Sequence, residues 1–240
     1  MDARGKIFLA LDGLSARQAL QLTREACESS LWRIIAGVKI HSLFDQEGPS
    51  IIPRLRKAGA PVILVDMKIH DTPGAAALRA AALKDVGADV ITTHASGGVE
   101  MMRAVVERGP FVLGVTILTS LSRADVRRIY RMPLANAVLL LARDAQEAGI
   151  REIVCSPDYV VDLAHTEDLR SLCFVTPNIR LFDRYADDVG EQMRENTPYR
   201  AFRNGATHIV LGSEYTDPTD TESRLAVLKQ IVEQIESVPR

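Results

Sequence analysis

The sequence predicts an α/β protein of the (β/α)8 barrel class, also called the TIM barrel. Eight short runs rich in β-branched residues alternate along the chain with longer stretches whose apolar residues recur three and four positions apart. The strand candidates are almost continuously apolar, as expected for strands buried on both faces of a parallel sheet. The 240 residues are close to the roughly 250 that are typical of such a barrel. We therefore expect a single domain over residues 1–240.

Each expected element can be placed on the sequence. The strands are expected, in order, at Ile7–Asp12, Ile34–Ile40, Val62–Asp66, Val90–His94, Phe111–Leu118, Glu152–Cys155, Leu172–Thr176 and His208–Gly212. The helices are expected at Ser15–Ser29, Glu47–Ala58, Gly74–Val86, Gly98–Glu107, Leu134–Ala148, Pro157–Ala164, Pro198–Asn204 and Thr219–Ser237. Ser15 is a candidate N-cap, and glycines follow four of the helices, at Gly59, Gly87, Gly149 and Gly205. An open, doubly wound sheet is the alternative, but no Gly-x-Gly-x-x-Gly turn follows the first strand.

Composition argues against several classes of protein. Lysine and arginine number 29 against 31 acidic residues, without a basic block, so nucleic acid is not expected as a partner. The apolar run Ile7–Leu11 is too short for a signal peptide or a membrane span. The three cysteines, at positions 27, 155 and 173, have no metal-ligand spacing. We expect a soluble, cytoplasmic protein that holds no metal.

The segment Asp66-Met67-Lys68-Ile69-His70-Asp71 is the strongest candidate for an active site. It follows an apolar strand, so alternation places Asp66 and Lys68 on one face and Asp71 in the next loop. Active sites of such barrels lie at the carboxyl ends of the strands. A structural ion pair is an equally good explanation of Asp66 and Lys68 alone. Lys39, at the end of the otherwise apolar second strand, favours a catalytic network of two lysines and two carboxylates.

Other polar residues follow the remaining strands. Phosphate sites in these barrels are often built after the seventh and eighth strands. There the chain has Arg180, which offers a guanidinium, and Gly212, whose backbone an anion can approach closely. An arginine in a loop is more often only solvated. Zinc spacings, a P-loop and a Ser-His-Asp pattern are not found in the sequence.

Seven short motifs follow the predicted strands in order: Leu9-Ala10-Leu11-Asp12, Lys39, Asp66/Lys68/Asp71 with Pro73, residues 94–98, residues 115–120, Val154-Cys155-Ser156 and residues 175–180. In this order they resemble the orotidine 5′-phosphate decarboxylases over nearly the whole chain. The resemblance implies a cofactor-free barrel that converts orotidine 5′-monophosphate to uridine 5′-monophosphate and carbon dioxide. It also implies a homodimer with active sites at the interface.

The resemblance assigns roles to individual residues. Lys68 would protonate C6 of the pyrimidine, Asp66 would face the substrate carboxylate, and Lys39 would hold Asp66 and the ribose. The other subunit would donate Asp71, which together with Asp66 would keep Lys68 in its charged form. The remaining substrate contacts would be Asp12 to the ribose, Thr119 and Ser120 to the base, and Arg180, Gln192, Gly212 and Ser213 at the phosphate end.

The second strand also bears on the choice of branch. Related sugar-phosphate decarboxylases and hexulose-phosphate synthases share the Asp-x-Lys-x-x-Asp motif but bind magnesium through an acidic residue at this position. The chain has Lys39 there, and an ammonium cannot ligate a hard cation. The resemblance therefore favours the metal-free branch.

Three positions depart from the family pattern. Ser213 stands where the family has an arginine on the phosphate, Ala75 where it has a threonine, and Asn178 where it has a glycine. Losing a hydrogen bond to a charged group would weaken binding by roughly ten- to a hundredfold. Either another arginine compensates, the candidates being Arg184, Arg194 and Arg203, or the substrate differs at its phosphate end; which of these and Arg180 contacts the phosphate is left open.

Three functions are therefore compared. The first is the decarboxylase. The second is a related barrel acting on a different nucleotide or sugar phosphate. The third, a catalytically silent nucleotide-binding protein, is the least favoured, because all four charges at Lys39, Asp66, Lys68 and Asp71 are retained.

Overall fold

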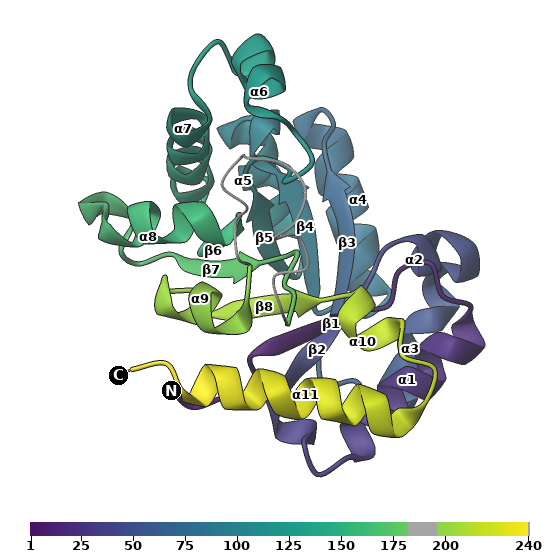
Figure 1. The fold of residues 1–240 in the computed structure, drawn as a ribbon. Helices are drawn as coiled ribbons and strands as arrows, with labels where there is room; N and C mark the ends of the chain where they lie inside the picture. The colour runs from purple at the N-terminus through teal and green to yellow at the C-terminus, as the bar shows by residue number, and fades with distance from the viewer. Residues whose placement is uncertain (182–195, 240) are drawn as a thin grey trace. The chain divides into compact units, whose positions relative to one another are not determined.

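The computed structural model describes residues 1–181 and 196–239. The strands form a closed parallel barrel in the order β1 to β8, which confirms the predicted fold class and rules out the open sheet. Figure 1 shows strands and helices alternating along the chain. The strands are β1 Ile7–Ala10, β2 Ile35–Ile40, β3 Ile63–Ile69, β4 Val90–His94, β5 Phe111–Val115, β6 Glu152–Val154, β7 Cys173–Thr176 and β8 His208–Leu211.

The helices lie between the strands. The described α-helices are α1 Ala16–Glu28, α2 Ser42–Glu47, α3 Ile51–Lys57, α4 Pro73–Asp85, α5 Val99–Arg108, α6 Arg123–Tyr130, α7 Leu134–Glu147, α8 Pro157–His165, α9 Pro198–Arg203, α10 Ser213–Thr216 and α11 Thr221–Glu236. Short 3₁₀ turns are described at Trp32–Ile34, Gly48–Ser50, Ala95–Gly97 and Glu167–Leu169. Ser15 caps α1 by accepting a hydrogen bond from the Gln18 amide, as predicted. The four predicted glycines that follow helices all have positive φ.

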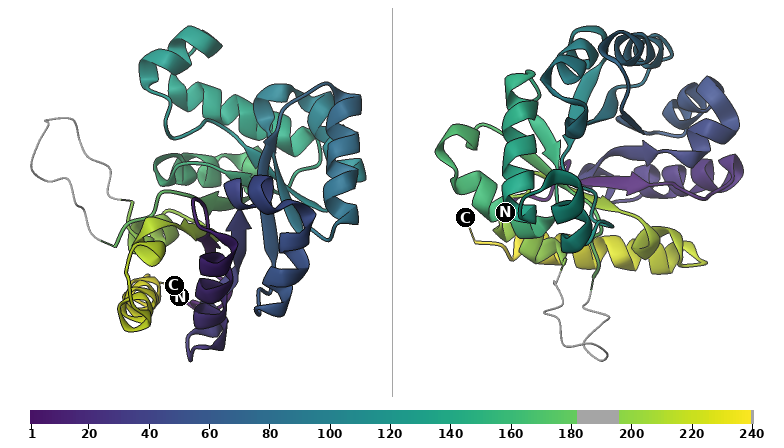
Figure 2. Two further views of the ribbon diagram at one scale, coloured as in Figure 1. Left: turned by 90° about the vertical axis from the view of Figure 1, so that its right-hand side faces the viewer. Right: turned by 90° about the horizontal axis from the view of Figure 1, so that it is seen from above.

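The chain forms two compact units, residues 1–63 with 176–240 and residues 64–175. The single domain expected from the sequence stays a prediction. In the first unit, β1 pairs in parallel with both β2 and β8. Helix α11 packs against α9 and α10, and α1 packs against α3. The two ends of the chain are close together (Figure 2), and the amino group of Met1 donates a hydrogen bond to the Val238 carbonyl at 3.1 Å.

The second unit contains the parallel series from β3 to β7. Residues pair in register along β4 and β5, from Val90 with Phe111 to His94 with Val115. The β3 and β4 register is interrupted, because Val65 pairs with Ile91 but Ile69 pairs with Thr93. Helices α4 and α5 pack against each other. This interruption falls in the segment predicted to hold the active site.

Several predicted boundaries were wrong for physical reasons. β3 runs to Ile69 rather than ending at Asp66, because Ile69 is a core residue with 1% exposure. β5 ends at Val115 rather than Leu118, since the chain turns at Leu118, whose carbonyl accepts from the Leu121 amide. The apolar run after Val115 is therefore apolar because it is buried, although it does not form a strand.

Short helices were also missed or misplaced. Helix α6, at the top of Figure 1, was not predicted, although Ser122 and Asp125 form a capping box at its start. Helices α2 and α10 were likewise not predicted. The helix expected from Glu47 begins as α3 at Ile51, after the 3₁₀ turn that contains Pro49.

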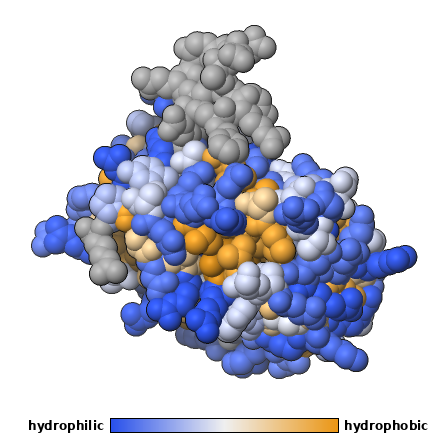
Figure 3. All heavy atoms as spheres, turned by 60° about the horizontal axis from the view of Figure 1, so that its bottom comes forward, coloured by the Kyte–Doolittle hydropathy of each residue, from blue (hydrophilic) through white to orange (hydrophobic). Residues whose placement is uncertain are grey.

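The surface in Figure 3 is mainly hydrophilic, with an apolar area on the face shown. Among the described residues, the large apolar side chains with substantial exposure are Trp32, Leu78, Phe111, Ile129, Leu140 and Val161. Leu78 on α4 is the most exposed of these, at 71%. Within the part of the chain that the structure describes, no helix is long and apolar enough to cross a membrane.

Candidate active site

The end of β3 holds a close ion pair. The ammonium of Lys68 donates a hydrogen bond from Nζ to Oδ2 of Asp66 at 2.7 Å. The Asp66 side chain is 11% exposed and that of Lys68 is 32% exposed. The sequence predicted that these two side chains meet at a strand end, and the structure brings them together. The more buried carboxylate thus holds an ammonium that still reaches solvent.

The backbone at Lys68 is unusual. Its φ is +47°, in the left-handed region that residues other than glycine rarely adopt. Its amide donates to the hydroxyl oxygen of Thr92 at 2.8 Å, and that hydroxyl donates to Oδ1 of Asp66 at 2.8 Å. Thr92 is 2% exposed. Sequence reasoning missed Thr92, although a hydroxyl inside an apolar strand was a signal, because buried hydroxyls need hydrogen-bond partners.

Asp71 lies in the loop after β3, as predicted, and is exposed. Its Oδ1 accepts a hydrogen bond from the Thr72 amide at 2.7 Å. Among the described residues, Asp71 and Lys68 of the same chain do not form an ion pair. Ala75, where the resemblance implies a threonine, is exposed in the first turn of α4.

Two histidines lie near the Asp66 and Lys68 pair. The rings of His70 and His94 meet edge to face, with their centroids 5.8 Å apart. Burial lowers the pKa of His94, and the charges of His70 and Lys68 lower it further, while Asp66 acts in the opposite direction. The surroundings of His94 therefore favour its neutral form.

The ends of β1 and β2 form a second ion pair. Nζ of Lys39 lies 2.5 Å from Oδ2 of Asp12. The Lys39 side chain is 12% exposed and that of Asp12 is 40% exposed. The loop after β1 is also held by Ser42, whose hydroxyl accepts from the Gly13 amide at 3.1 Å. The structure thus brings together two predicted substrate-binding residues, while the role of Lys39 beside Asp66 stays a prediction.

The loops after β7 and β8 meet through a hydrogen bond. Nη1 of Arg180 donates to the hydroxyl of Ser213 at 2.6 Å, and the Arg180 amide donates to the Asn196 carbonyl at 2.9 Å. Both side chains are half-buried. Ser213, where the resemblance implies an arginine, therefore contacts the arginine of the preceding loop.

Short helix α10 is anchored behind Ser213. The hydroxyl of Tyr215, which is fully buried, donates to the Leu22 carbonyl at 2.9 Å. Arg224 on α11 forms a buried ion pair with Glu25 on α1, at 2.7 Å. These contacts fix the chain that follows Ser213 to α1.

The other predicted binding residues have varied positions. Thr119 and Ser120 are exposed in the turn after β5, and Gly212 directly precedes α10. The guanidinium of Arg203 lies over the Tyr199 ring, 6.0 Å from its centroid. Gln192, Arg184 and Arg194 lie outside the described residues. Among the residues that the structure does describe, there is no group of three or more His, Cys, Asp or Glu suited to a metal ion.

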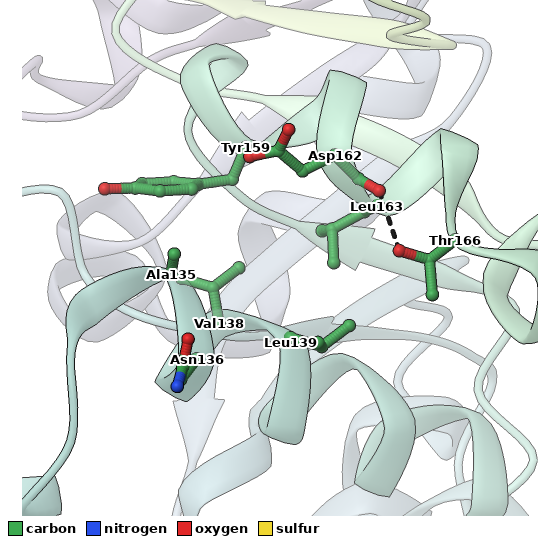
Figure 4. A pocket seen from close by; sticks show the side chains of 8 residues that line it. All are labelled: Ala135, Asn136, Val138, Leu139, Tyr159, Asp162, Leu163 and Thr166. Carbon is green, nitrogen blue, oxygen red and sulfur yellow. Dashed lines mark hydrogen bonds between the residues drawn. The ribbon is translucent and has the colours of Figure 1, made fainter.

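A hollow of about 110 Å³ lies elsewhere, between helices α7 and α8 (Figure 4). Its lining is mostly apolar, and the hydroxyl of Thr166 in its wall donates to the Asp162 carbonyl at 2.8 Å. The lining residues are Ala135, Asn136, Val138, Leu139, Tyr159, Asp162, Leu163 and Thr166. None of the predicted site residues is among them.

Comparison with known proteins places this geometry in context. The model of the "Orotidine 5'-phosphate decarboxylase / HUMPS family" matches residues 5–225. Orotidine 5'-phosphate decarboxylase of Nitrosococcus oceani is 34% identical over 240 residues, covering 97% of this chain and 99% of the relative. The enzyme of the same name from Idiomarina loihiensis is 34% identical over 233 residues, covering 92% of this chain and 95% of the relative. The crystal structure of orotidine 5'-phosphate decarboxylase from Lactobacillus acidophilus is similar with a TM-score of 0.77 at 27% identity, covering 98% of this chain and all of that one.

Proposed function

The chain belongs to the orotidine 5'-phosphate decarboxylase / HUMPS family, and from this membership we propose that it decarboxylates orotidine 5′-monophosphate to uridine 5′-monophosphate. The observation that carries the proposal is the Lys68 ammonium, hydrogen-bonded to Asp66 at the carboxyl end of β3. The reaction needs a proton at the carbon that loses carbon dioxide. The Lys68 ammonium, at the carboxyl end of a barrel strand, can deliver one. The product assigns the enzyme to pyrimidine biosynthesis, which we place in the cytoplasm.

Opposite charges divide the chemistry at the end of β3. Asp66 would repel the substrate carboxylate, and Lys68 would stabilise the carbanion that forms at C6 and then protonate it. Two unit charges 4 Å apart interact by about 4 kcal/mol at an effective dielectric constant of 20, so each effect is large enough to matter. Lys68 acts here as the general acid. We propose this role without a metal or a cofactor.

The ends of β1 and β2 would bind the sugar. Asp12 is the more exposed partner of the ion pair, and its carboxylate can accept hydrogen bonds from ribose hydroxyls. Lys39 would orient Asp12 and reach the ribose as a donor. We propose that it also completes the charged network with Asp66.

The phosphate end would be formed by the loops after β7 and β8. Nη1 of Arg180 donates to Ser213, and a guanidinium has five N–H groups in total, so others are available for an anion as far as the described residues show. Backbone groups at Gly212 and Ser213 and the side chain of Gln192 would add to this site. Thr119 and Ser120, exposed after β5, would contact the base.

We propose a homodimer in which Asp71 reaches the active site of the partner subunit. Asp71 is exposed, and the described residues show no pairing of it with Lys68 of the same chain. Leu78, on the helix that follows, is 71% exposed, as suits a residue buried by a partner. Measurement of the molar mass in solution tests this part of the proposal.

A second candidate function is suggested by Ser213 and Ala75. Because both depart from the family pattern near the substrate, a related barrel acting on a different nucleotide or sugar phosphate is the alternative. A spectrophotometric assay of orotidine monophosphate decarboxylation, run with a chelator present, separates the two. Turnover under these conditions supports the proposal. Inactivity combined with tight binding of uridine monophosphate would favour the alternative.

A further inference from the structure

We propose that Thr92 is a positioning residue for the proton donor, and that its hydroxyl sets the place of both Asp66 and Lys68. The inference rests on the proposed function, because it treats Lys68 as the acid. Thr92 itself lies on β4, is 2% exposed and would not touch the substrate. Its effect on the reaction would act through the two charged residues of β3.

Counting hydrogens fixes the direction of the contacts. A backbone amide can only donate, so the amide of Lys68 donates to Oγ1 of Thr92 at 2.8 Å. The one hydrogen of the hydroxyl is then free for Oδ1 of Asp66, also at 2.8 Å. Oδ2 of the same carboxylate accepts from the Lys68 ammonium at 2.7 Å. Thr92 therefore closes a ring of contacts that joins the backbone of Lys68 to its side chain through Asp66.

The strand geometry explains why this hydroxyl is needed. Between the pairs Val65 with Ile91 and Ile69 with Thr93, the residues of β3 from 66 to 68 face Thr92 alone. The regular backbone hydrogen bonds between β3 and β4 cannot pair all three residues. Lys68 in addition has a left-handed backbone, with φ at +47°. The Thr92 side chain accepts from the Lys68 amide in place of a ladder carbonyl. It thereby stabilises the bulge that turns Lys68 back toward Asp66.

The neighbouring threonine supplies a matched control. Thr93 is fully buried, and its hydroxyl donates to the Ile69 carbonyl at 2.9 Å. Side chains alternate along a strand, so Thr93 lies on the opposite face of β4 from Thr92. Both hydroxyls join β4 to β3, but only that of Thr92 contacts the charged pair.

The test compares Thr92→Val, Thr92→Ser and Thr93→Val in the full-length protein. We expect Thr92→Val to lower kcat by about 10- to 100-fold with a smaller change in KM, because the acid is displaced while the substrate contacts remain. Thr92→Ser keeps the hydroxyl and is expected to restore most of kcat. Thr93→Val is expected to lower the unfolding temperature while leaving kcat near the wild-type value.

Several results would overturn the proposal: an unchanged kcat in Thr92→Val, equal loss of kcat in Thr93→Val, or a Thr92→Ser variant as slow as Thr92→Val. If Thr92→Val does not fold, Thr92→Cys replaces it, because a thiol of similar size is a weak hydrogen-bonding group and should lower kcat in the same direction. A crystal structure of Thr92→Val gives a readout independent of turnover. Asp66 and Lys68 unmoved in it would refute the positioning role, even if the wild-type protein failed to decarboxylate orotidine monophosphate.

Discussion

The carboxyl ends of β3 and β8 are built differently. At β3 the charged side chains of Asp66 and Lys68 are held by a left-handed residue, a bulge and the buried hydroxyl of Thr92. At β8 the position where the resemblance implies an arginine holds Ser213, whose hydroxyl accepts a hydrogen bond from Arg180 of another loop. In the first region the charged side chains are joined to the backbone of their own strand through Thr92 of the neighbouring strand, whereas in the second the side chains of Arg180 and Ser213 meet from two different loops.

This difference indicates where the chain can vary without losing its chemistry. A displacement of about 1 Å in a proton donor can lower the rate by a large factor. The β3 end, which holds the proposed donor, therefore needs a rigid support. Binding a phosphate needs positive charge and N–H donors, which different loops can supply. We therefore expect substitutions at the β3 end to act on kcat, and those at the β8 end to act on KM.

The largest effect is expected at the β3 end. Lys68→Ala removes the proposed general acid, and kcat should fall by at least about 10²- to 10⁴-fold. The decarboxylation assay measures this loss, and Lys84→Ala is the control, because Lys84 is an exposed lysine in the last turn of α4. Retained activity in Lys68→Ala would show that Lys68 is not the proton donor. It would also contradict the proposed difference between the β3 end, which acts on kcat, and the β8 end, which acts on KM.

Arg180→Ala should have the next largest effect. Loss of a charged hydrogen bond of about 1.5–3 kcal/mol would raise KM roughly ten- to a hundredfold, with less change in kcat. Steady-state kinetics at several substrate concentrations separates the two constants. Arg203→Ala is the comparison, since Arg203 lies over the Tyr199 ring. A larger rise in KM for Arg203→Ala than for Arg180→Ala would reassign the phosphate contact.

Ser213→Ala is expected to have a smaller effect of the same kind. The variant loses the hydroxyl that accepts from Arg180, and a hydrogen bond of about 0.5–1.5 kcal/mol corresponds to a rise in KM of roughly two- to tenfold. Ser213→Thr keeps the hydroxyl and serves as the control. If kcat fell in Ser213→Ala while KM stayed constant, the assignment of kcat to the β3 end and of KM to the β8 end would be wrong.

The smallest effect on activity is expected at the other end of β8. Burial, with a further contribution from the charge of Lys6, lowers the pKa of His208 to about 4 from an unfolded value near 6.5. Because the folded pKa is depressed, protonation favours the unfolded state, and stability present above pH 6.5 is lost as the pH falls toward 4. At pH 4 the loss in the free energy of unfolding would reach about 3 kcal/mol.

Urea unfolding at pH 7, 5 and 4 measures this loss, with His208→Gln as the reference that lacks the titrating ring. The wild type should lose more stability than the variant over this range, while both keep similar activity at pH 7. Parallel pH profiles for the two proteins would show that His208 does not titrate as its burial implies.

Much of the fold followed from local patterns. Alternating apolar runs and amphipathic stretches, with glycines after the helices, predicted the order of strands, because each element must bury its own apolar face. The pattern failed where burial and secondary structure diverge. Ile117 is buried beyond the end of β5, and Ile69 continues β3 past two charged residues.

The candidate site was predicted in part. Asp66 with Lys68, and Asp12 with Arg180 and Ser213, could be named because polar residues directly after apolar strands are unusual. Which of them touch could not be predicted, since the pairs Lys39 with Asp12 and Arg180 with Ser213 join residues 27 and 33 positions apart.

The sequence by itself determined the barrel class, the family and the charged residues at the strand ends, because these depend on residue type and local periodicity. Only the tertiary structure showed the left-handed backbone at Lys68 and the role of Thr92 beside it. A threonine in a strand has the same local signature whether its hydroxyl meets a backbone carbonyl, as at Thr93, or the carboxylate of Asp66, as at Thr92. The register between neighbouring strands decides which of the two it meets, and register is a property of the packed sheet.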